Sequence, residues 1–145
     1  MEEPTQQAVS KKLGRVLVVD DAVEVRKTVR VTLTMAGYDV VEAEDGAQAI
    51  TIMDSTDHRF RVDAILCDIR MPRLNGTEAI SYFRVQYPSV PVLVLTAYPD
   101  VDLDVYLLKQ GVQDVLIKPV SRDRLLPAIE KCVNHHELIK DSFAV

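Results

Sequence analysis

Five polar residues each follow a short hydrophobic run of the chain: Asp20, Asp21, Asp68, Thr96 and Lys118. Taken singly, an aspartate at the end of a strand usually caps the next helix. Three carboxylates placed together repel one another, which disfavours their ionisation. A Mg²⁺ ion relieves that repulsion, because it prefers a few carboxylate oxygens together with water. The set therefore predicts a magnesium site with a lysine beside it.

Such a site has a defined chemistry. A carboxylate beside Mg²⁺ and a lysine is a nucleophile toward phosphorus and forms an acyl phosphate. Phosphoryl transfer requires stabilisation of the charge on the equatorial oxygens. The metal would take one oxygen, the Lys118 ammonium a second and the Thr96 hydroxyl a third.

These residues meet only if the elements before them form one sheet. Five short apolar runs alternate with amphipathic stretches, at residues 16–19, 38–43, 62–67, 90–95 and 115–117. Four of the runs have the composition of parallel strands covered on both faces. The run 38–43 carries polar residues and suits an edge strand.

The amphipathic stretches predict five helices. They are expected at residues 25–36 with Gly37 as the cap, at 45–53 with Asp45 as the cap, from about 77 to 87, between Pro99 and Gly111, and after Ser121. Five β-α units predict a doubly wound α/β sandwich with the flavodoxin-like strand order 2-1-3-4-5. In this fold the functional crevice lies at the carboxyl ends of the strands, where the polar residues stand.

Composition supports a single globular domain. The chain has 145 residues, and its 22 acidic and 17 basic residues give a net charge of −5. This charge argues against direct binding of nucleic acid or an anionic membrane. No run of 18 apolar residues and no secretory signal is present, so a cytoplasmic location is expected. We expect a flexible tail at 1–13, the domain at 14–134, and an extension of the last helix or a tail at 135–145.

Cysteine and histidine offer no alternative chemistry. Cys67 and Cys132 lack metal-ligand spacing and are expected to be buried, reduced thiols rather than a disulfide. His135 and His136 have no further ligands nearby in sequence, so a solvated helix end is expected rather than a metal pair.

Four sets of residues match a known family in order and spacing: Asp20-Asp21, the stretch from Asp68 to Gly76 (DIRMPRLNG), Leu95-Thr96-Ala97, and Lys118-Pro119. On these residues the chain resembles the receiver domain of two-component response regulators, over most of 14–134. The resemblance implies that Asp68 accepts a phosphoryl group from the phosphohistidine of a histidine kinase or a histidine phosphotransfer protein. Asp20, Asp21, Asp68 and the main-chain carbonyl of Arg70 would hold Mg²⁺.

The resemblance also implies roles for the remaining matches. Lys118 would contact the phosphoryl oxygens, and its bond to Pro119 would be cis. Thr96 would turn toward the phosphoryl group and report its presence. Met71-Pro72 would shape the loop after the acceptor, and Gly76 would relieve backbone constraint there.

One departure concerns the switch. Many receivers carry an aromatic residue three positions before the lysine, and this chain has Val115 there. Loop movement must then carry more of the switch, and Tyr98 is either a partial substitute or only a half-buried aromatic residue of the loop. Arg70 and Tyr98 occupy positions at which the family tunes attack by water on the acyl phosphate.

The implied output is a protein contact rather than catalysis on another substrate. The stretch between Pro99 and Gly111 has more apolar residues than one buried stripe holds, so one or two should be exposed. The expected partners are a downstream protein or effector domain, or a second copy bound through this helix, the strand 115–117 and the last helix.

Three alternative functions can be compared with this pattern. A flavin-binding carrier shares the fold, but the acids Asp20, Asp21 and Glu24 would repel a phosphate there. A phosphoaspartyl hydrolase of the haloacid dehalogenase kind needs a second aspartate where Arg70 stands. A receiver-fold scaffold or adaptor with vestigial phosphorylation remains open.

Overall fold

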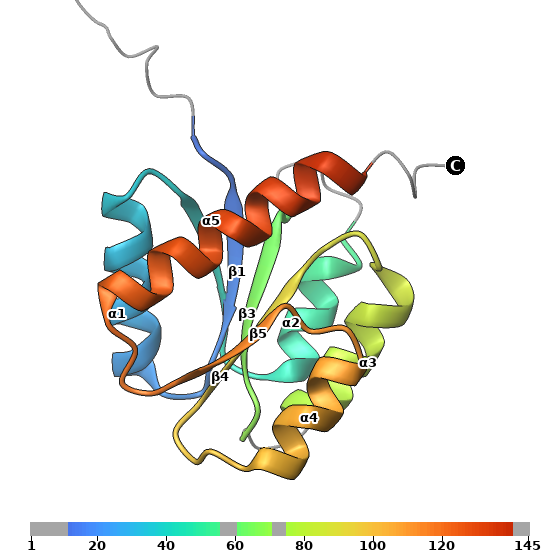
Figure 1. Ribbon diagram of the computed structural model, residues 1–145. Coiled ribbons are helices and arrows are strands. Elements are labelled where there is room, and N and C mark those ends of the chain that lie inside the picture. Colours follow the sequence, from blue (N-terminus) through green and yellow to red (C-terminus); the bar gives the residue numbers. More distant parts are fainter. Residues whose placement is uncertain (1–11, 56–60, 71–74, 141–145) are drawn as a thin grey trace, which may run out of the picture.

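The protein alternates strands and helices throughout the described chain. The computed structural model describes residues 12–55, 61–70 and 75–140, so Met71-Pro72 and parts of both terminal segments lie outside it. The elements are β1 (Arg15–Val19), α1 (Val23–Met35), β2 (Asp39–Ala43), α2 (Gly46–Met53), β3 (Ala64–Asp68), α3 (Gly76–Gln86), β4 (Val92–Thr96), α4 (Val101–Lys109), β5 (Asp114–Ile117) and α5 (Arg122–Ile139) (Figure 1).

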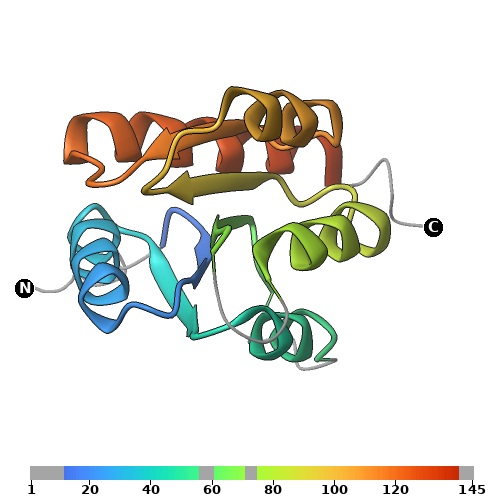
Figure 2. The same cartoon turned by 90° about the horizontal axis from the view of Figure 1, so that it is seen from below.

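The five strands form one parallel sheet in the order β2-β1-β3-β4-β5. Helices α1 and α5 cover one face, and α2, α3 and α4 cover the other (Figure 2). The predicted fold class and strand order are therefore confirmed. Because all strands run in one direction, their carboxyl ends meet at a single edge.

Alternation of side chains along the strands divides the core into two clusters. On β1, Val16 and Val18 face α1 and α5, whereas Leu17 and Val19 face the other three helices. The central strand β3 is buried at every position, which explains its apolar sequence from Ala64 to Cys67. The sheet thereby forms a rigid platform for the loops that follow its strands.

The predicted start and stop residues of the helices mostly act as caps. The side chains of Asp45 and Ser121 accept hydrogen bonds from main-chain N–H groups of α2 and α5, and Asp100, which the sequence analysis did not name, does the same for α4. Gly37 has a φ of +105° directly after α1, as a helix-terminating glycine requires. The capping box of α3, Asn75 with Glu78, was not predicted, although its N-x-x-E spacing is a known signal.

The prediction that the last strand is covered on both faces holds for Val115 and Leu116 but not for Ile117. Strand β5 lies at the edge of the sheet, and Ile117 is 52% exposed. Only Leu116 of this strand is fully buried. Leu116 packs into the cluster under α1 and α5 and Val115 packs against the opposite cluster, whereas Ile117 at the carboxyl end of the strand is exposed.

The prediction of a solvated helix end was wrong for His136. Helix α5 continues to Ile139, and His136 is buried with its Nδ1 2.9 Å from Asp63 Oδ1. The second carboxylate oxygen of Asp63 accepts a hydrogen bond from the Arg15 main-chain N–H at 2.8 Å. This cluster fastens the end of α5 to the amino-terminal edge of the sheet.

The contacts of Asp63 with His136 and Arg15 should make the stability of the fold depend on pH in the acidic range. Burial by itself raises the pKa of Asp63, but the hydrogen bonds from His136 and Arg15 and the charges of His136 and Lys140 outweigh it and lower the pKa below 3.8. A lowered pKa stabilises the fold above the ordinary value, and that contribution is lost as pH falls through the folded value. Asp63→Asn should therefore lower the free energy of unfolding by about 1 kcal/mol or more at pH 7.

Urea unfolding between pH 7 and pH 3 measures this effect. The difference in the free energy of unfolding between wild type and Asp63→Asn should become smaller below about pH 4. His136→Gln should show a weaker acid dependence than wild type, since one lowering contact is gone. A gap that stays constant over this range would contradict the prediction.

Candidate functional site

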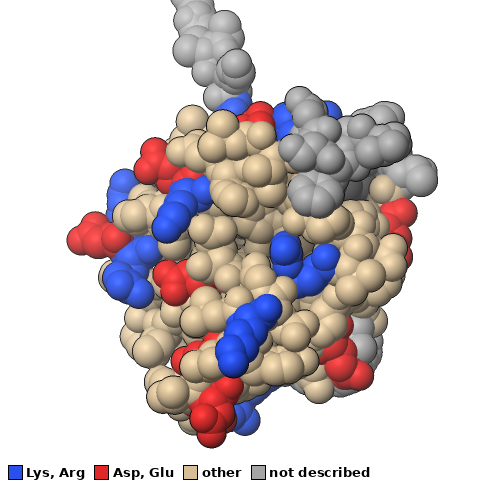
Figure 3. Space-filling model, turned by 45° about the vertical axis from the view of Figure 1, so that its right-hand side comes forward, with Lys and Arg blue, Asp and Glu red and all other residues tan. Residues whose placement is uncertain are grey.

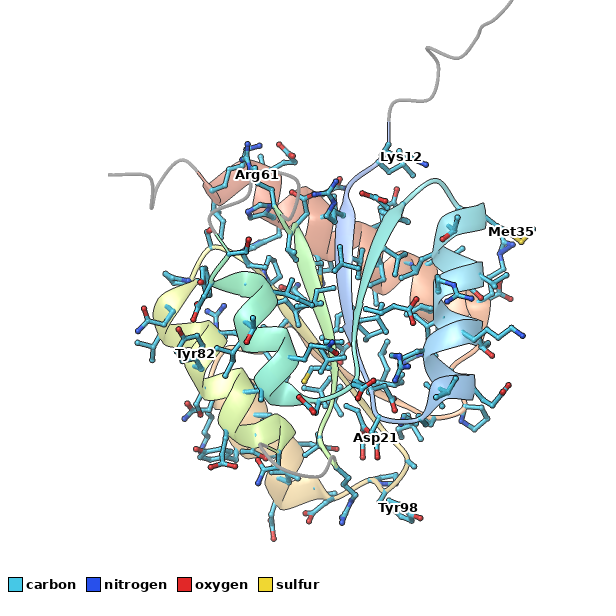
Figure 4. All side chains as sticks on the ribbon, turned by 180° about the vertical axis from the view of Figure 1, so that it is seen from behind. Lys12, Asp21, Met35, Arg61, Tyr82 and Tyr98 are labelled. Carbon is cyan, nitrogen blue, oxygen red and sulfur yellow. The ribbon has the colours of Figure 1, made fainter. Side chains whose placement is uncertain are left out.

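The five sequence-predicted polar residues lie at one edge of the sheet. Asp20 and Asp21 follow β1, Asp68 and Thr96 are the last residues of β3 and β4, and Lys118 follows β5. Asp20, Asp68 and Thr96 are buried, whereas Asp21 is exposed. Figure 4 shows Asp21 and Tyr98 at this edge, with Lys12 and Arg61 at the opposite one.

Lys118 joins the two buried acids. Its Nζ lies 2.8 Å from Asp20 Oδ2 and 3.3 Å from Asp68 Oδ2. The bond between Lys118 and Pro119 is cis, as the family resemblance implied. The Lys118 main-chain N–H donates to the carbonyl of Thr96 at 2.8 Å, which attaches the lysine to the end of β4.

The electrostatics of the site favour an added cation. Burial and the charge of Asp20 raise the pKa of Asp68, although Lys118 and the Arg70 N–H act in the opposite direction. Burial alone would lower the pKa of Lys118, but its hydrogen bond to Asp20 and the charges of Asp20 and Asp68 raise it. One ammonium group therefore leaves the repulsion between the acids incompletely compensated.

The donor set fits Mg²⁺. One carboxylate oxygen from each of Asp20, Asp21 and Asp68 lies within 4.8 Å of the others. These are hard oxygen ligands, which Mg²⁺ prefers over nitrogen and sulfur. Asp21 is exposed, so water has access on that side.

Thr96 and Tyr98 interact within the β4–α4 loop. The Thr96 Oγ1 accepts a hydrogen bond from the Tyr98 N–H at 3.1 Å and donates to the Tyr98 carbonyl at 3.3 Å. The Tyr98 ring is exposed and packs against the Arg70 guanidinium, whose Cζ lies 5.0 Å from the ring centroid. This contact links the loops after β3 and β4 beside the acids.

Gly76 has a different role from the one expected. It is the first residue of α3 and has no positive φ, so it does not relieve backbone constraint. A Cβ at this position would lie 2.2 Å from the Asp68 carbonyl oxygen and 2.6 Å from the Ile69 Cα. Glycine is required because the helix start lies directly against the main chain of Asp68.

The sequence reasoning thus located the acids and the lysine but missed two supports. Arg26 donates to the main-chain carbonyl of Asp20, and Gly76 allows α3 to approach Asp68. The Arg70 main-chain N–H donates to Asp68 Oδ1 at 3.3 Å, and the metal-binding role of its carbonyl stays a prediction. The only signal in the sequence for the contact between Arg26 and Asp20 is the position of Arg26 in the first two turns of the helix after Asp20-Asp21.

Comparison with known proteins agrees with this arrangement. The family model of the response regulator receiver domain matches residues 16–130. The transcriptional regulatory protein ZraR of Escherichia coli O157:H7 is 37% identical over 125 residues, which cover 86% of this chain and 27% of that protein. The response regulator MprA of Mycobacterium ulcerans is 37% identical over 130 residues, covering 90% and 54%. This chain thus spans only about a quarter to a half of these relatives.

Solved structures show the same fold. A response regulator receiver domain protein from Clostridium thermocellum superposes with a TM-score of 0.79 at 26% identity, covering 87% of this chain and 98% of that one. The chemotaxis response regulator CheY4 of Vibrio cholerae has a TM-score of 0.73 at 31% identity, covering 82% and 98%. The chain belongs to the family of receiver domains of two-component response regulators. Among the described residues, no helix has the length and apolarity needed to cross a membrane.

Proposed function

We propose that this receiver accepts a phosphoryl group on Asp68 in a Mg²⁺-dependent reaction and thereby switches a protein–protein contact. The donor is the phosphohistidine of a histidine kinase or a histidine phosphotransfer protein, and the location is cytoplasmic. The observation that carries the proposal is the contact of half-buried Lys118 with the buried Asp20 and Asp68 at the carboxyl ends of the strands. The proposed receiver domain occupies residues 14–134, between a segment at 1–13 and one at 135–145.

The chain's own residues account for the steps of the reaction. A carboxylate oxygen of Asp68 attacks the phosphorus, the bond from phosphorus to the donor imidazole breaks, and the imidazole leaves with a proton. Lys118, already 3.3 Å from Asp68 Oδ2, binds a phosphoryl oxygen. Thr96 supplies a hydroxyl to another oxygen after leaving its contacts with Tyr98.

Asp20, Asp21, Asp68 and the carbonyl of Arg70 would hold the metal. When bound, Mg²⁺ supplies charge stabilisation at the phosphoryl oxygens and aligns them for in-line transfer. The chain acts only on itself in this scheme, through its own phosphorylation and dephosphorylation, and not on a separate substrate.

A scaffold or adaptor with vestigial phosphorylation is the alternative function. A scaffold has no need for two buried carboxylates beside a half-buried lysine, because burial of charge costs free energy. The retention of all five polar residues at one edge therefore favours the phosphoacceptor.

Incubation with a small acyl phosphate tests the two functions. With Mg²⁺ present, intact-mass spectrometry should detect the addition of one phosphoryl group, and a chelator should suppress it. The Asp20→Ala, Asp21→Ala double variant should also react slowly and bind Mn²⁺ at least about tenfold more weakly than wild type. A protein that gains no mass in Mg²⁺, with either an acyl phosphate or a phosphorylated kinase, would be the scaffold.

The proposed contact surface lies on α4 and β5. Four apolar residues of α4 are exposed, which exceeds the one or two predicted: Val101, Val105, Tyr106 and Leu108. Ile117 of β5 adds to them. On this side of the molecule, uncharged surface predominates between scattered charged side chains (Figure 3). The surface suits a downstream protein, an effector domain or a second copy of the chain.

Phosphorylation should strengthen association through this surface. Thr96 precedes the loop into α4 and Lys118 follows β5, so the two groups proposed to contact the phosphoryl group adjoin this surface on both sides. Sedimentation velocity with a beryllofluoride mimic should show a larger species, and Val105→Glu should reduce it by about tenfold in association constant. An unchanged mass, together with unchanged amide exchange at residues 97–110, would exclude this surface from the mechanism.

A further inference from the structure

Every polar atom of Asp20 has a partner in the structure. Its main-chain N–H donates to the Ala43 carbonyl at 3.1 Å, and its Oδ1 accepts from the Ala22 N–H at 2.9 Å. Its Oδ2 pairs with Lys118, and its main-chain carbonyl accepts from Arg26 Nη1 at 2.7 Å. Asp20 is therefore fixed at four points, while its neighbour Asp21 is exposed.

Arg26 is itself held by an acid on the edge strand. Its Nε lies 3.2 Å from Glu42 Oε1, and Arg30 Nη1 lies 2.8 Å from Glu42 Oε2. The Arg26 side chain is only 13% exposed. Burial raises the pKa of Glu42, but the hydrogen bonds and charges of Arg30 and Arg26 outweigh it and lower the pKa, which keeps this carboxylate ionised.

The order of the strands explains why the contacts from Glu42 through Arg26 extend to Asp20 in the candidate site. Glu42 pairs with Val18 in the β1–β2 ladder, two residues before Asp20. A planar guanidinium can donate in two directions at once, which a single ammonium group cannot do at the same geometry. Arg26 thus bridges β2 to the loop that carries both metal-binding aspartates.

We propose that Arg26, anchored by Glu42, is a positioning residue that preorganises the Asp20-Asp21 loop for a divalent cation. This inference rests on the proposed metal site. Arg26 does not contact the cation or the phosphoryl group. It acts by fixing the main-chain carbonyl of Asp20, so that the loop does not have to be ordered when the cation binds.

The experiment compares Arg26→Gln with Arg30→Gln. Both variants lose an ion pair with Glu42, but only the first loses the hydrogen bond to Asp20. Calorimetry with Mn²⁺ alone should show about tenfold weaker binding for Arg26→Gln and a change of less than about twofold for Arg30→Gln. Arg26→Lys and Glu42→Gln should fall between these values, and they keep the test informative if Arg26→Gln folds poorly.

A second readout separates positioning from chemistry. For Arg26→Gln, the Mg²⁺ concentration that gives half the maximal rate of phosphorylation by an acyl phosphate should rise about tenfold, while the maximal rate stays near that of wild type. Equal Mn²⁺ affinity in wild type and Arg26→Gln would overturn the role of Arg26 and leave the proposed metal site intact. An equal loss of Mn²⁺ affinity in Arg30→Gln would do the same. If wild type binds no Mn²⁺, the proposed metal site fails and this inference fails with it.

Discussion

Replacement of Asp68 by asparagine should abolish phosphorylation and at the same time stabilise the protein. The amide oxygen of asparagine is not a nucleophile toward phosphorus, so the rate with an acyl phosphate should fall by at least about a thousandfold. The buried charge of Asp68 is unfavourable beside Asp20, as its raised pKa indicates. Without metal, Asp68→Asn should therefore raise the free energy of unfolding at pH 7 by about 1 kcal/mol.

The opposite signs of these two effects make the result specific. Intact-mass spectrometry measures the phosphoryl group, and urea unfolding in a chelating buffer measures the stability. Asp114→Asn is the matched control, since Asp114 is exposed at the amino-terminal end of β5, away from the site. A mass gain in Asp68→Asn at the wild-type rate would show that the acceptor is another residue.

Gly76→Ala should damage both the fold and the site. The added Cβ would lie 2.2 Å from the carbonyl oxygen of Asp68, so the main chain of either α3 or β3 has to move. Contact with main-chain atoms cannot be relieved by rotation of a side chain, and we expect a loss of about 3 kcal/mol in unfolding free energy. A displacement of Asp68 by about 1 Å would also slow phosphorylation by about a hundredfold.

Gly37→Ala provides the control for stability alone. Gly37 has a φ of +105° after α1, at the other end of the sheet, so alanine is strained there without touching Asp68. It should lower the unfolding free energy by about 1–2 kcal/mol and leave the phosphorylation rate unchanged. If Gly76→Ala had the same effect as Gly37→Ala on stability and on the phosphorylation rate, the close approach of α3 to Asp68 would not be the reason for glycine at position 76.

The sequence was sufficient to predict the site where a general rule of the fold determines the position of individual residues. Asp68 ends a strand, Asp20 and Lys118 each directly follow one, and parallel strands bring their carboxyl ends to one edge of the sheet whatever the conformation of the loops. Their contact through the Lys118 ammonium follows from this rule. The composition of residues 100–108 likewise predicted an exposed apolar surface, because one helix face cannot bury them all.

Sequence reasoning failed where a role depends on a partner distant along the chain. His136 and Asp63 are 73 positions apart, and only the length and direction of α5 bring them together. The contact between Gly76 and Asp68 depends on the angle at which α3 begins, and no periodicity encodes that angle. In the sequence, Arg26 is an ordinary polar residue of an amphipathic helix. Only the pairing of β1 with β2 in the structure shows that Glu42 lies beside it.

The hydrogen bonds of the Thr96 hydroxyl within its own loop define a balance between two populations. The 3.3 Å bond that the hydroxyl donates is long for an O–H···O bond, the 3.1 Å bond that it accepts is of ordinary length, and each contributes about 0.5–1.5 kcal/mol. Turning the hydroxyl toward Asp68 therefore costs only a few kcal/mol, which corresponds to a turned form at about 0.1–10% before any phosphoryl group arrives. Under the proposed switch, phosphorylation of Asp68 would enrich a conformation that the unphosphorylated protein already populates.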